Sequence, residues 1–233
     1  MSNTDSFVEE VNEEVRRDRL YGLLRRYGWI AVLAIVLIVG GAAYTEYSKA
    51  QRAASAQAQG DAMLAALSLD DSAERAESLA AIDPASLAAG AVLRMMTAAE
   101  QARAGDTEAA AATLDALAVD GEVPAIYRQL AQFKSVTLQS ASLESADRRQ
   151  AFEAMAQPGN ALRLLATEQL ALIDIETGDP AAAIAKYQSI IDDAEVSPDL
   201  QQRALQVIVA LGGEPELSDA MPLVPDSSTA ITD

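Results

Sequence analysis

The feature that most constrains this chain is an uncharged stretch of nineteen residues, Tyr27–Thr45, with the sequence YGWIAVLAIVLIVGGAAYT. As an α-helix it would extend roughly 29 Å, close to the ~30 Å hydrocarbon core of a bilayer. Trp29 lies near its beginning, and Tyr44 and Tyr47 lie near its end, where aromatic rings settle at the depth of the lipid headgroups. The stretch therefore predicts a transmembrane helix over residues 27–45.

A cleaved signal peptide and a buried core helix are the two competing interpretations. The apolar core of a signal peptide is usually about 7–15 residues long and is followed closely by a small-residue cleavage site. Here the apolar run is longer, and the nearest such patterns, within residues 54–58, lie well past its end. Helices inside soluble domains seldom carry so long an apolar run with aromatic ends. We therefore expect an uncleaved signal anchor.

The charges on either side of the stretch predict its orientation. The arginines that precede it are Arg16, Arg17, Arg19, Arg25 and Arg26, whereas only Lys49 and Arg52 follow within a comparable distance. Basic residues are enriched on the cytoplasmic side of membrane spans. We therefore expect a single-pass membrane protein with a cytoplasmic N-terminus and a C-terminal domain on the other side of the membrane.

The composition argues against catalysis. The chain has no cysteine and no histidine, so it lacks thiolate nucleophiles, imidazole bases and the usual zinc and copper ligands. Acidic pairs such as Asp70-Asp71 and Asp192-Asp193 lack the spacing of a calcium-binding loop, and no G-x-S-x-G or S-x-x-K motif is present. We expect neither an enzyme nor a metal or cofactor site.

The negative charge is concentrated after the apolar stretch. Residues 1–45 carry six acidic and five basic residues, whereas residues 46–233 carry twenty-nine acidic and twelve basic residues, a net charge of −17. Such a domain does not neutralise nucleic-acid phosphates, and an anionic lipid surface repels it. The charge favours either a self-repelling soluble surface or recognition of basic or unfolded segments, and we expect no nucleic-acid partner.

The rest of the chain predicts helices only. Alanine, the best helix former, is abundant, and long β-branched runs are scarce outside the apolar stretch. Turn signals separate segments of roughly 10–20 residues with helical spacing; they are Asp70-Asp71, Asp83-Pro84, Gly105-Asp106, Asp120-Gly121, Pro158-Gly159, Gly178-Asp179-Pro180 and Ser197-Pro198. The pattern predicts an all-α chain, with a helical extension over residues 46–68 and antiparallel helical hairpins over residues 69–212.

The two ends of the chain carry different patterns. Residues 1–26 predict a cytoplasmic amphipathic helix, with Val11 and Val15 on an apolar face that contacts either the membrane interface or a partner protein. Residues 213–233 are rich in proline, serine and acidic residues, which predicts a disordered tail.

The clearest hairpin lies between residues 162 and 191. Apolar residues fall on one face of each of its helices: Leu162, Leu165, Ala166, Leu170 and Ile173 in the first, and Ala183, Ile184, Tyr187, Ile190 and Ile191 in the second. Gly178 supplies the left-handed residue that ends the first helix, and Pro180 suits the first position of the next. A last helix from about Pro198 to Leu211 is expected to cover the open end of the array, as solenoids require.

An internal match indicates repeats. The segment A-R-A-G-D-T-E-A-A-A at 102–111 aligns with I-E-T-G-D-P-A-A-A-I at 175–184, so that Gly105 and Ala110 correspond to Gly178 and Ala183. The second copy resembles a tetratricopeptide repeat: Gly178 fits the glycine between the helices, Ala183 the small packing residue, Ile184 its neighbour and Tyr187 the aromatic that fills the seam. Its first helix departs from the pattern at Thr167, Ala171 and Asp174.

The spacing of the two copies predicts an irregular array. The interval of 73 residues between the glycines is not a multiple of the 34-residue tetratricopeptide period. We therefore expect a degenerate tetratricopeptide-like solenoid of three hairpins and a cap, with a generic helical bundle as the alternative.

The whole arrangement resembles the bacterial ancillary SecYEG translocon subunit family. The resemblance covers residues 5 to about 212 and is most specific in S-F-V-E-E-V-N-E-E-V-R-R-D-R-L at 6–20, followed by the aromatic-bounded span, an Ala/Gln-rich helix and a compact repeat domain. Members of this family are single-span inner-membrane proteins with periplasmic tetratricopeptide-like domains. The resemblance implies contact with protein-export channel subunits and with periplasmic chaperones or exported client proteins, and it implies no catalytic residue.

Two binding functions remain open at the level of sequence. In a periplasmic adaptor, exposed residues on the first helix of each hairpin would contact the partner; the candidates are Arg94, Gln101, Arg163, Thr167 and Asp174. In a structural accessory subunit of another inner-membrane complex, for example a respiratory one, the span and the N-terminal helix would be lodged permanently in that complex. Self-association is a third possibility, but the span lacks a G-x-x-x-G motif.

Overall fold

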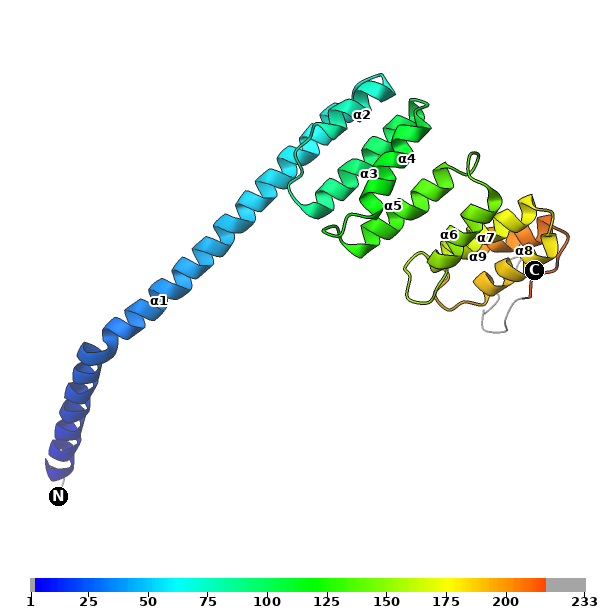
Figure 1. Ribbon diagram of the computed structural model, residues 1–233. Coiled ribbons are helices and arrows are strands. Elements are labelled where there is room, and N and C mark those ends of the chain that lie inside the picture. Colours follow the sequence, from blue (N-terminus) through cyan, green and yellow to red (C-terminus); the bar gives the residue numbers. More distant parts are fainter. Residues whose placement is uncertain (1–2, 217–233) are drawn as a thin grey trace, which may run out of the picture. The chain divides into compact units, whose positions relative to one another are not determined.

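The computed structural model describes residues 3–216 of the chain, and the side chains of residues 3–25, 27, 28, 31 and 32 lie outside this description. Over the described range the chain forms helices and no strand (Figure 1), and the prediction of an all-α fold is confirmed. The helices are α1 (Asn3–Leu67), α2 (Ser72–Ala80), α3 (Leu87–Arg103), α4 (Thr107–Ala118), α5 (Ala125–Leu138), α6 (Ser145–Met155), α7 (Arg163–Glu176), α8 (Pro180–Ile191) and α9 (Pro198–Ala210).

The chain divides into two compact units, Met1–Gly60 and Asp61–Asp233, and the boundary between them lies within α1. Among the described residues, no helix is both long and apolar enough to cross a membrane. The span predicted over residues 27–45 includes four residues whose side chains lie outside the description. The side chains of Arg25, Val11 and Val15, which the sequence predicts to take part in anchoring or partner contact, also lie outside the description.

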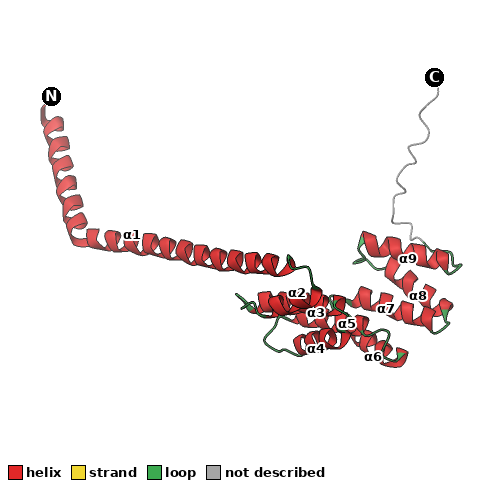
Figure 2. Ribbon diagram, turned by 90° about the horizontal axis from the view of Figure 1, so that it is seen from above, coloured by secondary structure: helices red, strands yellow, loops and turns green. Residues whose placement is uncertain are grey.

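The second unit is an array in which each helix packs mainly against its neighbours in sequence. Packing is closest between consecutive helices from α2 to α5 and again from α6 to α9, whereas α5 and α6 share only a small contact. The more distant pair α3 and α5 also meets, and these two helices lie side by side in both views (Figures 1 and 2). Local contacts of this kind are typical of helical repeats.

The acidic residues at the turns begin the helices. The side chains of Asp71, Asp106 and Asp179 accept hydrogen bonds from backbone N–H groups in the first turns of α2, α4 and α8. Ser86 and Ser197 do the same for α3 and α9. Because the first N–H groups of a helix have no partner within it, these caps explain why the helices begin at the predicted turn signals.

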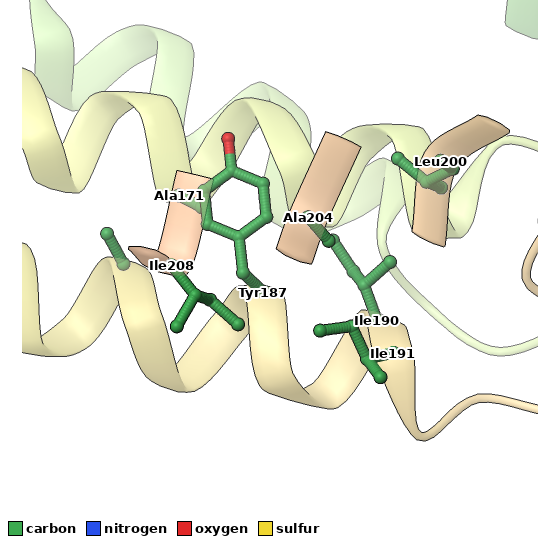
Figure 3. Close-up of a cluster of buried hydrophobic side chains, with 8 residues drawn as sticks. Ala171, Tyr187, Ile190, Ile191, Leu200, Ala204 and Ile208 are labelled. Atoms are coloured by element: carbon green, nitrogen blue, oxygen red, sulfur yellow. The ribbon is translucent and has the colours of Figure 1, made fainter. Parts of the chain in front are cut away.

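The core consists of four local clusters of buried side chains rather than one centre. The first joins the end of α1 to α2 and α3, the second joins α3, α4 and α5, the third joins α5, α6 and α7, and the last joins α7, α8 and α9. In the last cluster the ring of Tyr187 lies among Ala171, Ala204 and Ile208 (Figure 3). Small residues on the neighbouring helices leave room for this ring.

The helices α3, α4 and α5 recur as α7, α8 and α9 with a constant offset of 73 residues. Both ends of α4 and α8 are offset by this amount, as are the ends of α3 and α7 and the starts of α5 and α9. The matching turns are also alike: Gly105 has φ +87° and Gly178 has φ +82°. We call α3–α5 repeat one and α7–α9 repeat two; α6 and the connections on either side of it fill the interval between them.

Repeat two ends the array with a more polar face. In repeat one, Phe133 of α5 packs edge-to-face on Phe152 of α6, with 5.6 Å between the ring centroids, and Val136 packs on the same cluster. The equivalent positions in α9 are Gln206 and Val209, and Val209 is 62% exposed. Replacing the aromatic ring by an amide suits a helix on which no further helix packs among the described residues.

Candidate partner-binding surfaces

Two of the predicted contact residues, Arg94 and Gln101, line one cavity. It has a volume of about 340 Å³ and lies between α2, α3 and α4. The Arg94 Nη1 atom donates to Asp120 Oδ2 at 2.8 Å, and this hydrogen bond is the main reason that the pKa of Asp120 is lowered. Gln101 Oε1 accepts a hydrogen bond from Thr113 Oγ1 at 2.9 Å. Arg94 stays half-exposed and remains accessible to a partner.

Arg163 is held by two carboxylates. Its Nη1 and Nη2 atoms donate to Asp193 at 2.6 and 2.8 Å, and Nη2 also donates to Glu195 at 2.6 Å. The hydrogen bonds from Arg163 lower the pKa of Asp193 to about 2. Thr167 donates its hydroxyl hydrogen to the Arg163 carbonyl oxygen, one helical turn earlier, at 2.9 Å. The pairing of Arg163 therefore fixes the start of α7 against the loop that follows α8.

Asp174 is buried, so the expectation that its side chain is exposed is wrong. Only 4% of the side chain is accessible, because residues from α6, α7 and α8 close over it. Lys186 Nζ donates to Oδ2 at 2.5 Å, and Arg149 Nη1 pairs with Oδ1 at 2.8 Å. Burial alone would raise the pKa of Asp174, but the hydrogen bonds from Lys186 and Arg149 outweigh it, and the pKa is lowered.

Of the residues predicted to pack the repeats, Gly105 and Gly178 are exposed at the turns, whereas the other four lie in or against the core. Ala110 and Ala183 are fully buried at equivalent places in α4 and α8, and Tyr187 is 1% exposed. Ile184 packs partly buried against the same cluster. Burial raises the pKa of the Tyr187 hydroxyl to about 12. These side chains hold the scaffold and are not available to a partner.

A second, more apolar groove was not predicted from the sequence. It has a volume of about 330 Å³ and lies between α3 and α5, with Met95, Ala99, Ala102, Phe133, Lys134 and Leu138 among its lining residues. Its floor is formed by Ala98 and Leu114, both nearly inaccessible to solvent. The small residues Ala98, Ala99 and Ala102 on one face of α3 were the signal that could have revealed it.

Acidic side chains in the described part of the chain form no group of three that could hold a metal ion. The carboxylates described above are instead engaged by arginine or lysine, or cap helices.

Known proteins provide no assignment. Comparison with protein-family models, with curated proteins and with solved structures finds no match to this chain. A function must therefore be argued from the repeats, the groove and the pattern of the sequence.

Proposed function

We propose that this protein is a membrane-tethered, non-enzymatic adaptor that holds partner proteins on tetratricopeptide-like repeats. The observation that carries the proposal is the groove between α3 and α5, the first helices of successive hairpins. Successive first helices line the concave face of such arrays, and grooves of this kind accept peptide segments. The apolar floor supplies contact area, and the surrounding polar rim supplies orientation.

The tether is proposed from α1. Between Leu33 and Val39 its apolar side chains are exposed on every side, among them Ile38 at 71%. A helix that is apolar all round requires either a protein core or lipid around it. Together with the uncharged stretch over residues 27–45 and the arginines before it, this favours an anchor with the N-terminus in the cytoplasm and the repeats in the periplasm.

The site of action is proposed from the family resemblance. An adaptor of this topology at the inner membrane would dock on protein-export channel subunits through α1 and would receive periplasmic chaperones or exported client proteins on its repeats. The acidic surface of the repeats is in keeping with partners that leave the channel unfolded, since it keeps the domain away from anionic lipid headgroups.

In-cell photocrosslinking tests this proposal. A photoreactive residue is placed at Ala99 and Leu138 in the groove, at Val11 and Val15 in the N-terminal helix, and, as a matched control, at Glu108 on α4 outside the groove. We expect groove crosslinks to chaperones or newly exported proteins, N-terminal crosslinks to channel subunits, and few crosslinks from Glu108. Stoichiometric crosslinks from all positions to one unrelated membrane complex would instead identify a structural accessory subunit.

Alkaline extraction and protease accessibility test the anchor separately. An anchored protein stays in the membrane pellet at high pH, and its repeat domain is degraded by protease only after the outer membrane is opened. Release into the supernatant would remove the membrane tether from the proposal while leaving the groove as a partner site.

A further inference from the structure

We infer that the groove between α3 and α5 binds a partner segment in which an apolar side chain stands next to a carboxylate, and that Lys134 receives this carboxylate. The carboxylate is that of an acidic side chain or of the C-terminus of the segment. The inference rests on the proposed protein-binding function and specifies the chemistry of the partner.

Repeat two is an internal control for the groove. At the positions equivalent to Ala99 and Ala102 it carries the larger residues Leu172 and Ile175. Leu114 on the floor is replaced by Tyr187, which is fully buried. Leu172 remains 43% exposed, whereas Ile175 packs partly buried on the last core cluster, so the same helical framework folds with part of this space filled by Tyr187 and Ile175. The open groove of repeat one is not required by the fold, and it removes apolar contact area that packing would otherwise gain.

Lys134 is one of two cations in the described part of the repeat domain, together with Arg128, that form no ion pair with a carboxylate. Eight arginine and lysine residues in the described part of this domain form ion pairs with carboxylates: Arg75, Arg94, Arg103, Arg148, Arg149, Arg163, Lys186 and Arg203. Arg128 lies near enough to Asp120 to help lower its pKa. Lys134, an exposed residue, pairs with none of the described carboxylates, although the domain is rich in them.

The position of Lys134 couples its charge to the groove. It lines the groove beside Phe133 on α5, opposite Met95, Ala99 and Ala102 of α3. In repeat two the equivalent residue is Val207, so repeat two lacks the cation, and the place of Leu114 on the groove floor is taken by the larger Tyr187. A cation kept free at the rim of an apolar groove favours a ligand that presents both features at once.

The chemistry of the groove also selects among partners. A basic segment would be attracted by the net charge of the domain, but at this groove it would meet the ammonium group of Lys134. A volume of about 330 Å³ is enough for one or two large apolar side chains. A neighbouring carboxylate then gains a charge-assisted hydrogen bond, which is roughly twice as strong as a neutral one.

Selection from a random peptide library tests the inference without assuming a sequence. The full-length protein in detergent is exposed to displayed twelve-residue peptides with free C-termini, and enriched peptides are measured by fluorescence anisotropy. Wild type is compared with Lys134→Glu and with the double variant Ala99→Leu/Ala102→Ile, which carries the residues of repeat two. The matched control is Val207→Lys, which places a lysine at the equivalent position of repeat two.

We expect wild type to enrich peptides that combine leucine, phenylalanine or methionine with an adjacent acidic residue or a free C-terminal carboxylate. Lys134→Glu should weaken their binding by about tenfold or more, which corresponds to about 1.4 kcal/mol. The double variant should abolish binding, and Val207→Lys should leave it unchanged. Circular dichroism melts of each variant establish that the variants are folded.

Other outcomes separate the inference from the proposed function. Enriched peptides that bind the double variant as well as wild type would overturn the groove assignment while supporting a protein-binding adaptor. Enrichment of basic peptides that bind more tightly to Lys134→Glu would overturn the carboxylate assignment alone. No enrichment at all would count against both proposals.

Discussion

Repeat one and repeat two share their backbone geometry but differ in the side chains that pack and bridge their helices. Both end their first helix with a left-handed glycine, and the N–H of the following aspartate, Asp106 or Asp179, donates to a carbonyl five residues earlier at 2.9 or 2.8 Å. The loops after their second helices also match: Glu122 N–H donates to the Asp120 carboxylate, and Glu195 N–H donates to the Asp193 carboxylate. Backbone geometry therefore persists where the side chains have diverged.

The side chains that bridge the helices differ in charge. Gln101 and Thr113 join α3 to α4 by a neutral hydrogen bond, whereas at the equivalent places Asp174 and Lys186 join α7 to α8 by an ion pair. In repeat two the carboxylate of the bridge is buried while Lys186 is 30% exposed, and the core of this repeat contains Tyr187. Repeat two thus has a buried charge between its first two helices, and repeat one retains open space between α3 and α5.

The largest difference in stability is expected when the core of repeat two is emptied. Tyr187→Ala should lower the free energy of unfolding by about 3–5 kcal/mol, since it removes a fully buried aromatic side chain. Tyr187→Leu, which gives α8 the residue found at Leu114 in repeat one, should cost clearly less because much of the volume is retained. Urea unfolding followed by circular dichroism measures both. Equal losses would mean that volume is not what Tyr187 contributes.

The bridging pairs give the next largest difference. Asp174→Ala should lower the free energy of unfolding by about 2–3 kcal/mol, because it leaves Arg149 and Lys186 without their carboxylate. Gln101→Ala should cost about 1 kcal/mol, the usual worth of a neutral hydrogen bond. The double variant Asp174→Ala/Lys186→Ala should recover part of the loss in urea unfolding. Equal losses of free energy of unfolding from Asp174→Ala and Gln101→Ala would show that the ion pair contributes no more stability than the neutral hydrogen bond.

Much of the framework was predictable because local signals determine it. The Gly-Asp turns, Pro180 and Ser197-Pro198 fix where helices end and begin, and the structure places the caps at these residues. The helical spacing of apolar residues predicted the buried faces of α8 and α9 in the last core cluster, whereas the predicted α7 residues Ala166, Leu170 and Ile173 lie in the third cluster. In a repeat array each helix packs on its sequence neighbours, so local patterns carry most of the fold.

The candidate site was less predictable because it depends on what faces each side chain across two helices. Asp174 was expected to be exposed, yet Arg149 from α6 and Lys186 from α8 bury it, and their positions follow only from the packing. The groove of repeat one was missed for a similar reason. Alanines on a helix predict close packing as readily as an open space, and the distinction becomes visible only against Leu172 and Ile175 of repeat two.

At the shared glycine turns the two repeats should respond alike to substitution. Gly105→Ala and Gly178→Ala should each lower the free energy of unfolding by about 1–2 kcal/mol, because an L-residue is strained at positive φ. An added Cβ meets no atom within 4 Å at either position, so a steric clash does not make one substitution more costly than the other.

Gly121→Ala is the matched control. Gly121 lies in open space without a positive φ, so the substitution should leave stability unchanged or slightly raised. Thermal unfolding of the three variants compares them directly. Unequal losses of stability at the two turns would show that the repeats differ in backbone geometry as well as in side chains.

The smallest expected difference lies in the loops after α4 and α8, and it appears only at low pH. The hydrogen bonds from Arg163 lower the pKa of Asp193 to about 2, below the ordinary value of 3.8, so ionised Asp193 stabilises the fold above pH 4. That contribution is lost as the pH falls from about 4 through 2, because the folded state must then bind a proton that it disfavours. Asp193→Asn should therefore lower the free energy of unfolding at pH 7 by at most about 1 kcal/mol and should flatten its dependence on pH below 4.

Asp120→Asn should have a still smaller effect, since Arg94 is half-exposed and makes a single hydrogen bond to Asp120. Urea unfolding of both variants from pH 2 to pH 7 measures the two contributions. A larger effect from Asp120 would mean that solvent exposure does not set the worth of these pairs, and that the loop of repeat one is as firmly held as that of repeat two.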